Sequence, residues 1–302
     1  MNEITTLDVK LKVPATVIRN LKLTKLIEKM GVSSDYCNPK LCTIFGEKTP
    51  VKHIACENNN VSIKILIYCL INKNTTSSQA PEIPQEFSKL CPTNVKLVKF
   101  DTMEKDALLK QHNDLRNHIA SGKHKKYNAA EKMAVMKWDN TLERMASLNI
   151  KQCNFAHDQC RNTYKYLYSG QNLGIREVID AAKSRREIMK NYQDLINIWI
   201  SEGDLYCDQS FIEAFRLHPK YPTLMVGHFT EMVKKENMFV GCSGSHYFKN
   251  HRYFYTIACN YASTNFLGEK IYHSGPSCSG CLTGCHTKYP ALCSEKELYK
   301  LV

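Results

Sequence analysis

The sequence lacks an apolar stretch long enough to cross a lipid bilayer. The apolar run near its front, Val61–Ile71, is interrupted by Lys64 and falls short of the roughly 20 residues that a spanning helix needs. The chain begins without an uninterrupted apolar core, so no secretory signal peptide is apparent. We therefore expect no transmembrane segment, and we expect the first residues to come from a faulty gene model.

Motifs of several other protein classes are missing as well. The net charge of +12 favours acidic partners, but the basic residues are scattered, with short clusters at Gly122–Lys126, Lys183–Arg186 and Val233–Lys235. No RNA-binding, zinc-finger or basic-zipper pattern accompanies them, so we expect no nucleic-acid partner. No GxSxG nucleophile elbow supports Ser-His-Asp catalysis either.

Cysteine, in contrast, is abundant. The 14 cysteines have irregular, loop-like spacings, which is typical of disulfides formed in an oxidising compartment. Zinc is the rival interpretation, because Cys278 and Cys281 form a CxxC pair; no second CxxC follows it. A thioredoxin-like role would need this pair at a strand-to-helix junction, and its neighbours are Gly, Pro and Ser.

Secondary-structure patterns predict helices first and a hairpin afterwards. Asp101 and Glu104 have the spacing of a capping box, and Gly122 is a plausible stop for that helix. The predicted helices cover 101–122, 138–153 (capped by Asp139 or Asn140), 178–203 (one or two helices) and 223–233, and the predicted strands cover 238–248 and 252–262. This order favours the α+β class.

Four segments follow one another in the chain. They are a basic N-terminal extension (1–34), a cysteine-rich segment (35–100), the regular domain (101–265) and a cysteine-rich C-terminal extension (266–302). Isolated polar residues in the predicted helices, such as His112, Asn113 and Arg116, are expected to make structural hydrogen bonds. Trp138 and Trp199 are expected in the core.

Several short motifs occur in the order that a known family uses. They are "HNDLRNHIASG" (112–122), "CNFAHDQC" (153–160), "GQNL" (170–173), "GHFTEMV" (227–233) and "YTIACNY" (255–261). Together they resemble the CAP superfamily of cysteine-rich secretory proteins, antigen 5 and pathogenesis-related proteins. The cysteines of "YCNPKLC", "HIAC" and "LCP" resemble the antigen-5 branch of insect saliva and venom, and the tail resembles fly versions.

The resemblance implies a fold, a set of disulfides and a compartment. The fold is an α-β-α sandwich with a central cleft, in which 101–265 is the CAP domain. The implied disulfides are Cys37–Cys56, Cys42–Cys160, Cys91–Cys153 and Cys242–Cys259; the last is also plausible because both cysteines lie on the predicted hairpin. The pairing of Cys69, Cys207, Cys278, Cys281, Cys285 and Cys293 stays open. An extracellular, secreted monomer is expected.

The family's cleft gathers two histidines and two acidic residues. The matching positions here are His157, His228, Glu202 and Gln171, the last being Glu in many relatives. Neither histidine has an HxxxH or HxH partner in the sequence, so the family alone brings them together. We expect His157, His228 and Glu202 to be the ligands of any bound metal, with Zn or Cu as candidates and no cofactor required.

Two departures from the family pattern stand out. About 19 extra residues, near 61–79, separate the "HIAC" and "LCP" cysteines, and we expect them to be a gene-model artefact; the alternative is a genuine loop with glycosylation sequons at Asn60 and Asn74. Lys234 replaces a tryptophan that relatives carry after "MV". Either its side chain snorkels along the surface or the local packing differs.

The expected function is that of a secreted antigen-5-like protein. It would bind a small amphipathic ligand or an extracellular protein partner without enzymatic turnover. No catalytic residue is assigned, because Gln171 removes both a charge and a general base. The alternative is a metal-dependent hydrolase or a copper-supported redox enzyme that uses the cleft histidines.

Overall fold

The computed structural model describes residues 86–158, 161–163, 165–216 and 227–301. The predicted α+β class is confirmed, but three strands that were not predicted lie among the helices, before the hairpin. Their order is β1 (Lys96–Val98), α5 (Thr102–Ala120), β2 (Lys137–Trp138), α6 (Asn140–Ile150), β3 (Gly170–Val178), α7 (Arg185–Leu205), α8 (Gln209–Glu213), α9 (Gly227–Val233), β4 (Phe239–Lys249) and β5 (Arg252–Tyr261).

The sheet is built around the hairpin of β4 and β5. Its turn residues Asn250 and His251 have φ angles of 52° and 60°, the left-handed pair that a tight hairpin turn requires. β1 and β2 both pair with β4, whereas β3 pairs antiparallel with β5, so the main strand order is β1-β4-β5-β3. The predicted hairpin is confirmed, and β3 forms one edge of the sheet among the described strands.

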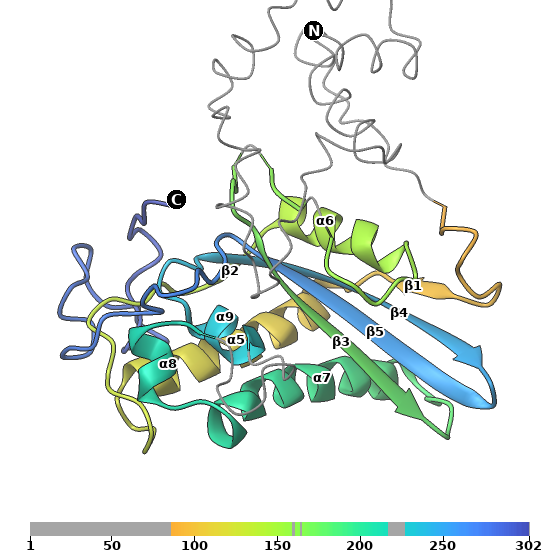
Figure 1. Cartoon of the computed structure of the whole chain (residues 1–302), viewed down its shortest axis with the longest axis horizontal. Coiled ribbons are helices and arrows are strands. Elements are labelled where there is room, and N and C mark those ends of the chain that lie inside the picture. Colours follow the sequence, from red (N-terminus) through yellow and green to blue (C-terminus); the bar gives the residue numbers. More distant parts are fainter. Residues whose placement is uncertain (1–85, 159–160, 164, 217–226, 302) are drawn as a thin grey trace, which may run out of the picture. The chain divides into compact units, whose positions relative to one another are not determined.

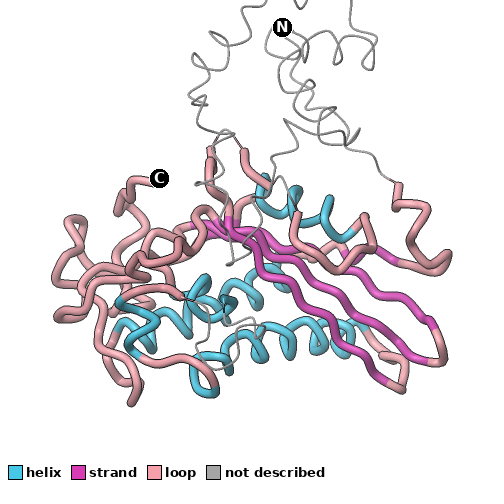
Figure 2. Tube along the Cα trace, in the orientation of Figure 1, coloured by secondary structure: helices cyan, strands magenta, loops and turns pink. Residues whose placement is uncertain are grey.

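Helices cover both faces of this sheet. Figures 1 and 2 show α6 on one face and α5, α7 and α9 on the other, which confirms the predicted α-β-α sandwich. Glycines allow the close approach: a Cβ on Gly241 would lie 2.0 Å from the backbone nitrogen of Glu143 in α6. On the other face, a Cβ on Gly174 would lie 3.2 Å from the indole of Trp199 in α7.

The helix boundaries follow local capping chemistry. Asp101 and Glu104 form the predicted capping box at the start of α5, and Asp139 caps α6 by accepting from two backbone N–H groups. The prediction of a helix from Val178 is wrong, because Val178 ends β3 and α7 begins only after Ser184, which caps it. Capping by this serine satisfies a backbone N–H that would otherwise be left unpaired.

Two of the implied disulfides lie among the described residues, and both are formed. Cys91–Cys153 ties the approach to β1 to the end of α6, and Cys242–Cys259 joins β4 to β5. The implied pairs Cys37–Cys56 and Cys42–Cys160 lie outside the described residues. Cys207 keeps a buried thiol, and burial raises its pKa to about 12, so this sulfur is a poor nucleophile.

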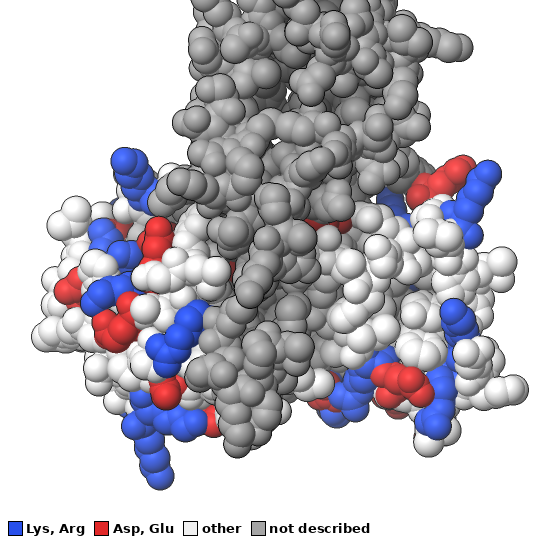
Figure 3. Space-filling model, in the orientation of Figure 1, with Lys and Arg blue, Asp and Glu red and all other residues white. Residues whose placement is uncertain are grey.

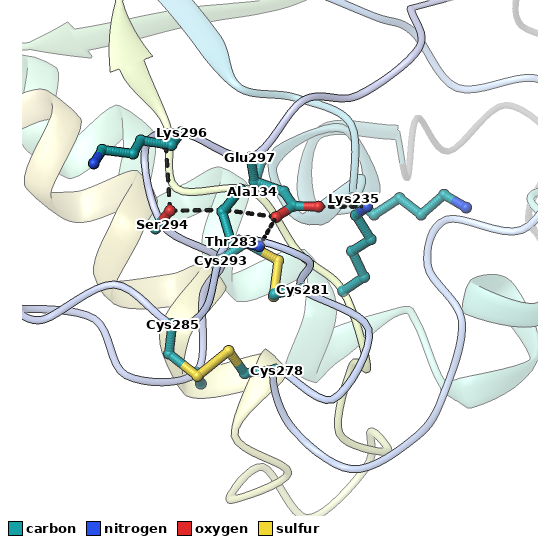
Figure 4. Close-up of a disulfide and its surroundings, with 12 residues drawn as sticks. Ala134, Lys235, Cys278, Cys281, Thr283, Cys285, Cys293, Ser294, Lys296 and Glu297 are labelled. Atoms are coloured by element: carbon teal, nitrogen blue, oxygen red, sulfur yellow. Dashed lines mark hydrogen bonds and ion pairs between the residues drawn. A yellow bond between two sulfur atoms is a disulfide. The ribbon is translucent and has the colours of Figure 1, made fainter.

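The C-terminal extension is stapled by two disulfides of its own. Cys278–Cys285 and Cys281–Cys293 hold its loops together (Figure 4). The loops also hold Glu297, which accepts from Thr283 and lies 2.6 Å from Lys132 of the main domain. Burial would raise the pKa of Glu297, but these partners outweigh it and lower that pKa to about 2. The disulfides therefore stabilise the extension internally, and the ion pair between Glu297 and Lys132 links it to the domain.

Lys234 is buried rather than snorkelling. Only 2% of the residue is exposed, and its Nζ lies 3.6 Å from the Glu236 carboxylate and 5.6 Å from the centre of the Phe266 ring. The first of the two sequence interpretations is therefore wrong. The local packing accommodates the charge by placing a carboxylate and an aromatic face beside it.

Charged side chains do not gather into one field on the surface that Figure 3 displays. There, lysine and arginine are interspersed with aspartate and glutamate over the described residues. This distribution agrees with the scattered basic clusters of the sequence.

Candidate functional site

Two histidine-centred contacts lie beside the edge strand β3. Gln171 and Asn172 are neighbours on this strand, so their side chains leave it toward opposite faces of the sheet. Gln171 contacts His157, and Asn172 contacts the backbone of His228. Two histidines that are 71 positions apart in the sequence therefore contact neighbouring residues of β3.

His228 is held by Glu202. The ring Nδ1 lies 2.5 Å from Glu202 Oε1, and Oε2 accepts from the backbone N–H groups of His228 (3.0 Å) and Phe229 (3.1 Å). Trp199, one turn before Glu202 on α7, stacks on the imidazole with 5.6 Å between ring centres. One carboxylate therefore fixes both the ring and the first residues of α9.

The far end of α9 is fixed by Arg116. Its guanidinium is fully buried and donates to the carbonyls of Met232 and Lys234, each at 2.8 Å, and to that of Ala134. Burial lowers the pKa of Arg116 to about 10, which still leaves it charged at neutral pH. The predicted structural role of this arginine is confirmed, and it supports the site by anchoring the helix that carries His228.

A second structural residue of the same motif reaches the cleft indirectly. His112 bonds the Leu108 carbonyl through Nδ1 (2.8 Å) and the Tyr261 hydroxyl through Nε2 (2.9 Å). That hydroxyl also accepts from Asn172, which in turn donates to the His228 carbonyl at 3.2 Å. The expected structural role of His112 is confirmed. The core tryptophan prediction holds for Trp199, whereas Trp138 is only half-buried.

His157 is held by an amide rather than a carboxylate. Its Nδ1 lies 3.0 Å from Gln171 Oε1, and the same oxygen accepts from the backbone N–H of Asp158 at 3.2 Å. Burial, together with the charge of the nearby Arg161, lowers the pKa of His157 to about 4. The ring is therefore neutral at physiological pH, the form that can ligate a metal.

Asp158 was not among the predicted site residues. It accepts from Gln171 Nε2 at 2.8 Å and from Gln152 at 2.6 Å, and burial raises the pKa of its carboxyl. Its position directly after His157 was the only sequence signal that could have identified it. Tyr261 and Asn172 were missed in the same way, because their contacts link residues far apart in the chain.

The donor set has two imidazoles, each oriented through Nδ1. Such a contact leaves the lone pair of a neutral ring on Nε2, as in the histidines of many metal sites. Glu202 is placed behind His228 as its orienting partner. Across the part of the chain that the structure describes, no group of three or more His, Cys, Asp or Glu side chains is arranged to hold a metal.

No helix in the described ranges is long and apolar enough to span a membrane.

Comparisons with known proteins support one family. A family model described as "CAP: Cysteine-rich secretory protein family" matches residues 109–261. "Venom allergen-1" of Aedes aegypti is 38% identical over 215 residues, which are 71% of this chain and 81% of that protein. "Antigen 5 like allergen Cul n 1" of Culicoides nubeculosus is 34% identical over 225 residues, or 72% and 88% of the two chains.

A solved structure resembles the fold. The crystal structure of NaASP2 with Zn2+ is 26% identical in sequence and has a TM-score of 0.51; the match covers 68% of this chain and 100% of that one.

Proposed function

Because this chain belongs to the cysteine-rich secretory protein (CAP) family, we propose that it is a secreted binding protein whose cleft holds one divalent metal ion between His157 and His228. Secretion is supported by the disulfides, which form in oxidising compartments, and by similarity to proteins named venom allergens. The metal is supported by the matched orientation of the two rings at the edge of β3.

The paired Nδ1 contacts carry the metal proposal. Glu202 and Gln171 each engage Nδ1, so both imidazoles, when neutral, present Nε2 as the coordinating atom. Two nitrogen ligands suit Zn2+ or Cu2+ and leave positions for an outside ligand. The structural relative that was crystallised with Zn2+ points the same way.

Binding without turnover is the role that these contacts favour. Glu202 already accepts three hydrogen bonds from His228 and Phe229, so its carboxylate is not placed to take a proton from a water. Gln171 is neutral and cannot act as a base. The alternative, a metal-dependent hydrolase or copper-supported redox enzyme, would need Glu202 to leave His228.

Isothermal titration calorimetry with Zn2+ and Cu2+ tests the proposal on the purified full chain. We expect one ion per chain, and we expect a His157→Ala/His228→Ala double variant to lose it. His118→Ala removes an exposed histidine remote from β3 and serves as the matched control, with unchanged binding. Equal binding by the double variant, or none by the wild type, would overturn the metal site. Loss of a hydrolytic or redox activity together with the ion would favour the enzyme.

A small amphipathic ligand is the second candidate, favoured by an open surface hollow beside the end of α6. Its lining mixes apolar and polar side chains: Ile150, Phe155, Leu173, Ile175, Tyr247, Asn149, Asn154, Ser245 and Thr256. Phe155 forms part of this lining and is 54% exposed, so a ligand could contact its ring. The mixed lining suits a ligand with an apolar chain and a polar end.

Native mass spectrometry with a fluorescent fatty acid tests this candidate. Phe155→Ser should weaken binding at least several-fold, because it removes an apolar wall of the hollow. Ile179→Ser is the control, since Ile179 is also exposed (68%) but does not line the hollow. Equal weakening by both variants would mean that the hollow is not the binding place.

A further inference from the structure

The side-chain amide of Gln171 is held in one orientation. The backbone N–H of Asp158 can only donate, and it lies 3.2 Å from Gln171 Oε1. The carboxylate of Asp158 accepts from Gln171 Nε2 at 2.8 Å. If the amide were flipped, Nε2 would face the backbone N–H of Asp158 and Oε1 would face its carboxylate. Neither pair could then form a hydrogen bond. The same residue therefore fixes both ends of the amide.

This orientation decides which nitrogen of His157 carries the proton. Gln171 Oε1, an acceptor, lies 3.0 Å from Nδ1, so Nδ1 must be the donor in this contact. The lone pair of the neutral ring is then on Nε2. Asp158 does not itself touch the imidazole; it acts through the amide.

We propose that Asp158 is the positioning residue that selects the Nδ1–H tautomer of His157, with Gln171 as the relay between them. The inference rests on the proposed metal function for its consequence, because the tautomer sets which nitrogen coordinates the ion. With glutamine at position 171, the orientation of each histidine ring is still set by a carboxylate. At His228 the carboxylate of Glu202 contacts the ring directly, and at His157 the carboxylate acts one amide away.

The surroundings of Asp158 suit this role. Its Oδ1 accepts from Gln152 at 2.6 Å, and its carbonyl accepts from Arg161 at 2.9 Å. Gln171 Nε2 has a second acceptor, Asn260 Oδ1, at 3.0 Å. Asn260 is an amide that can rotate to match its neighbour, whereas a carboxylate cannot become a donor without a proton. Asp158 therefore fixes the orientation of the Gln171 amide.

Two measurements on the full chain test the proposal: long-range ¹H–¹⁵N NMR of the His157 ring in metal-free protein, and zinc affinity by calorimetry. The wild type should show the Nδ1–H tautomer. Asp158→Asn offers Gln171 either an oxygen or an NH2 group, so that only the backbone N–H of residue 158 still opposes a flip; the variant should populate the Nε2–H tautomer and weaken zinc binding by about 10-fold or more. A double variant, Asp158→Asn with Gln171→Glu, moves the carboxylate onto the ring contact and should restore both readouts.

Gln152→Ala is the control, because it removes a partner of Asp158 that does not touch Gln171. It should leave the tautomer unchanged. If Asp158→Asn does not fold, Asp158→Ala, which removes the acceptor without adding a donor, replaces it. An unchanged tautomer in the folded variant would overturn this inference, whatever the zinc result. Absence of zinc binding by a wild type with the Nδ1–H tautomer would overturn the metal proposal and leave this one standing.

Discussion

The surroundings of the two histidines are built in different ways. His228 begins α9, a helix fixed at one end by Glu202 and at the other by Arg116, and its ring stacks on Trp199. His157 lies in the loop after α6, where side-chain contacts with Gln171 and neighbouring residues hold the ring. The fold itself places the first histidine, whereas a network of side chains places the second.

This difference should affect how much stability the protein loses when a residue on either side is replaced. A buried carboxylate that caps a helix and holds a ring is costly to remove, because its partners are left without an acceptor. In a network of side-chain amides, one residue can be replaced while the other hydrogen bonds remain. We therefore expect substitutions on the His228 side to affect stability more than those on the His157 side.

The largest effect is expected from Glu202→Ala. Removing this buried carboxylate breaks the contacts with His228 and Phe229 and should cost about 3–5 kcal/mol in the free energy of unfolding, measured by urea denaturation. Glu213→Ala is the control: that carboxylate is 40% exposed and pairs with Lys270 on the surface. Its loss should stay within about 1 kcal/mol. Equal losses for both variants would contradict the anchoring role of Glu202.

Gln171→Ala is expected to lower the free energy of unfolding by less, about 1–3 kcal/mol, because a neutral amide is removed and Asp158 loses one donor. The same urea experiment measures it. Gln209→Ala is the control: its half-buried amide bonds Glu213, Ser274 and the backbone N–H of Asn128, and its loss should lower the free energy of unfolding by less than that of the buried Gln171. A cost for Gln171→Ala as large as that of Glu202→Ala would remove the difference between the two sides.

Low pH should destabilise the folded protein through protonation of His157. Its folded-state pKa of about 4 lies below the ordinary value of 6.5, so the native state disfavours protonation of this ring. The stability that the neutral ring contributes is complete above about pH 6.5 and is lost as the pH falls toward 4. His157→Gln should flatten this part of the stability–pH curve by about 3 kcal/mol, measured by urea denaturation at each pH. Parallel curves for variant and wild type would contradict the burial of this ring.

The smallest effect is expected from Lys234→Met. An apolar side chain of similar length avoids burying an ammonium beside Phe266, so stability should stay within about 1 kcal/mol of the wild type or rise. Glu236 keeps a second cation, Lys235, at 3.9 Å. Lys235→Met, at a more exposed position, is the control for the loss of charge alone. A loss above about 3 kcal/mol for Lys234→Met would show that the buried ion pair stabilises α9 strongly.

Local signals were sufficient for much of the fold. The capping box of α5 and the hairpin of β4 and β5 depend on residues a few positions apart, and both were predicted. Strand β3 was missed as a strand, because Gly170 and Gly174 weaken its pattern; they are needed where Glu231 and Trp199 pack against the strand. Because the strand was not recognised, its last residue, Val178, was assigned to the helix that follows.

The site was predictable only in part. The family resemblance named His157, Gln171, Glu202 and His228, but their pairing depends on tertiary contacts across 14 and 26 positions. Asp158 has no pattern of its own in the sequence. Its role follows from hydrogen-bond directions, which exist only once β3 and the His157 loop lie side by side.

Anomalous diffraction from crystals of the full chain grown with Zn2+ would locate a bound ion. We expect one peak at the edge of β3, about 2.0–2.1 Å from Nε2 of both His157 and His228, with Glu202 still bonded to His228 Nδ1. A peak bound by Nδ1 of either ring, or the absence of a peak between the two histidines, would contradict it.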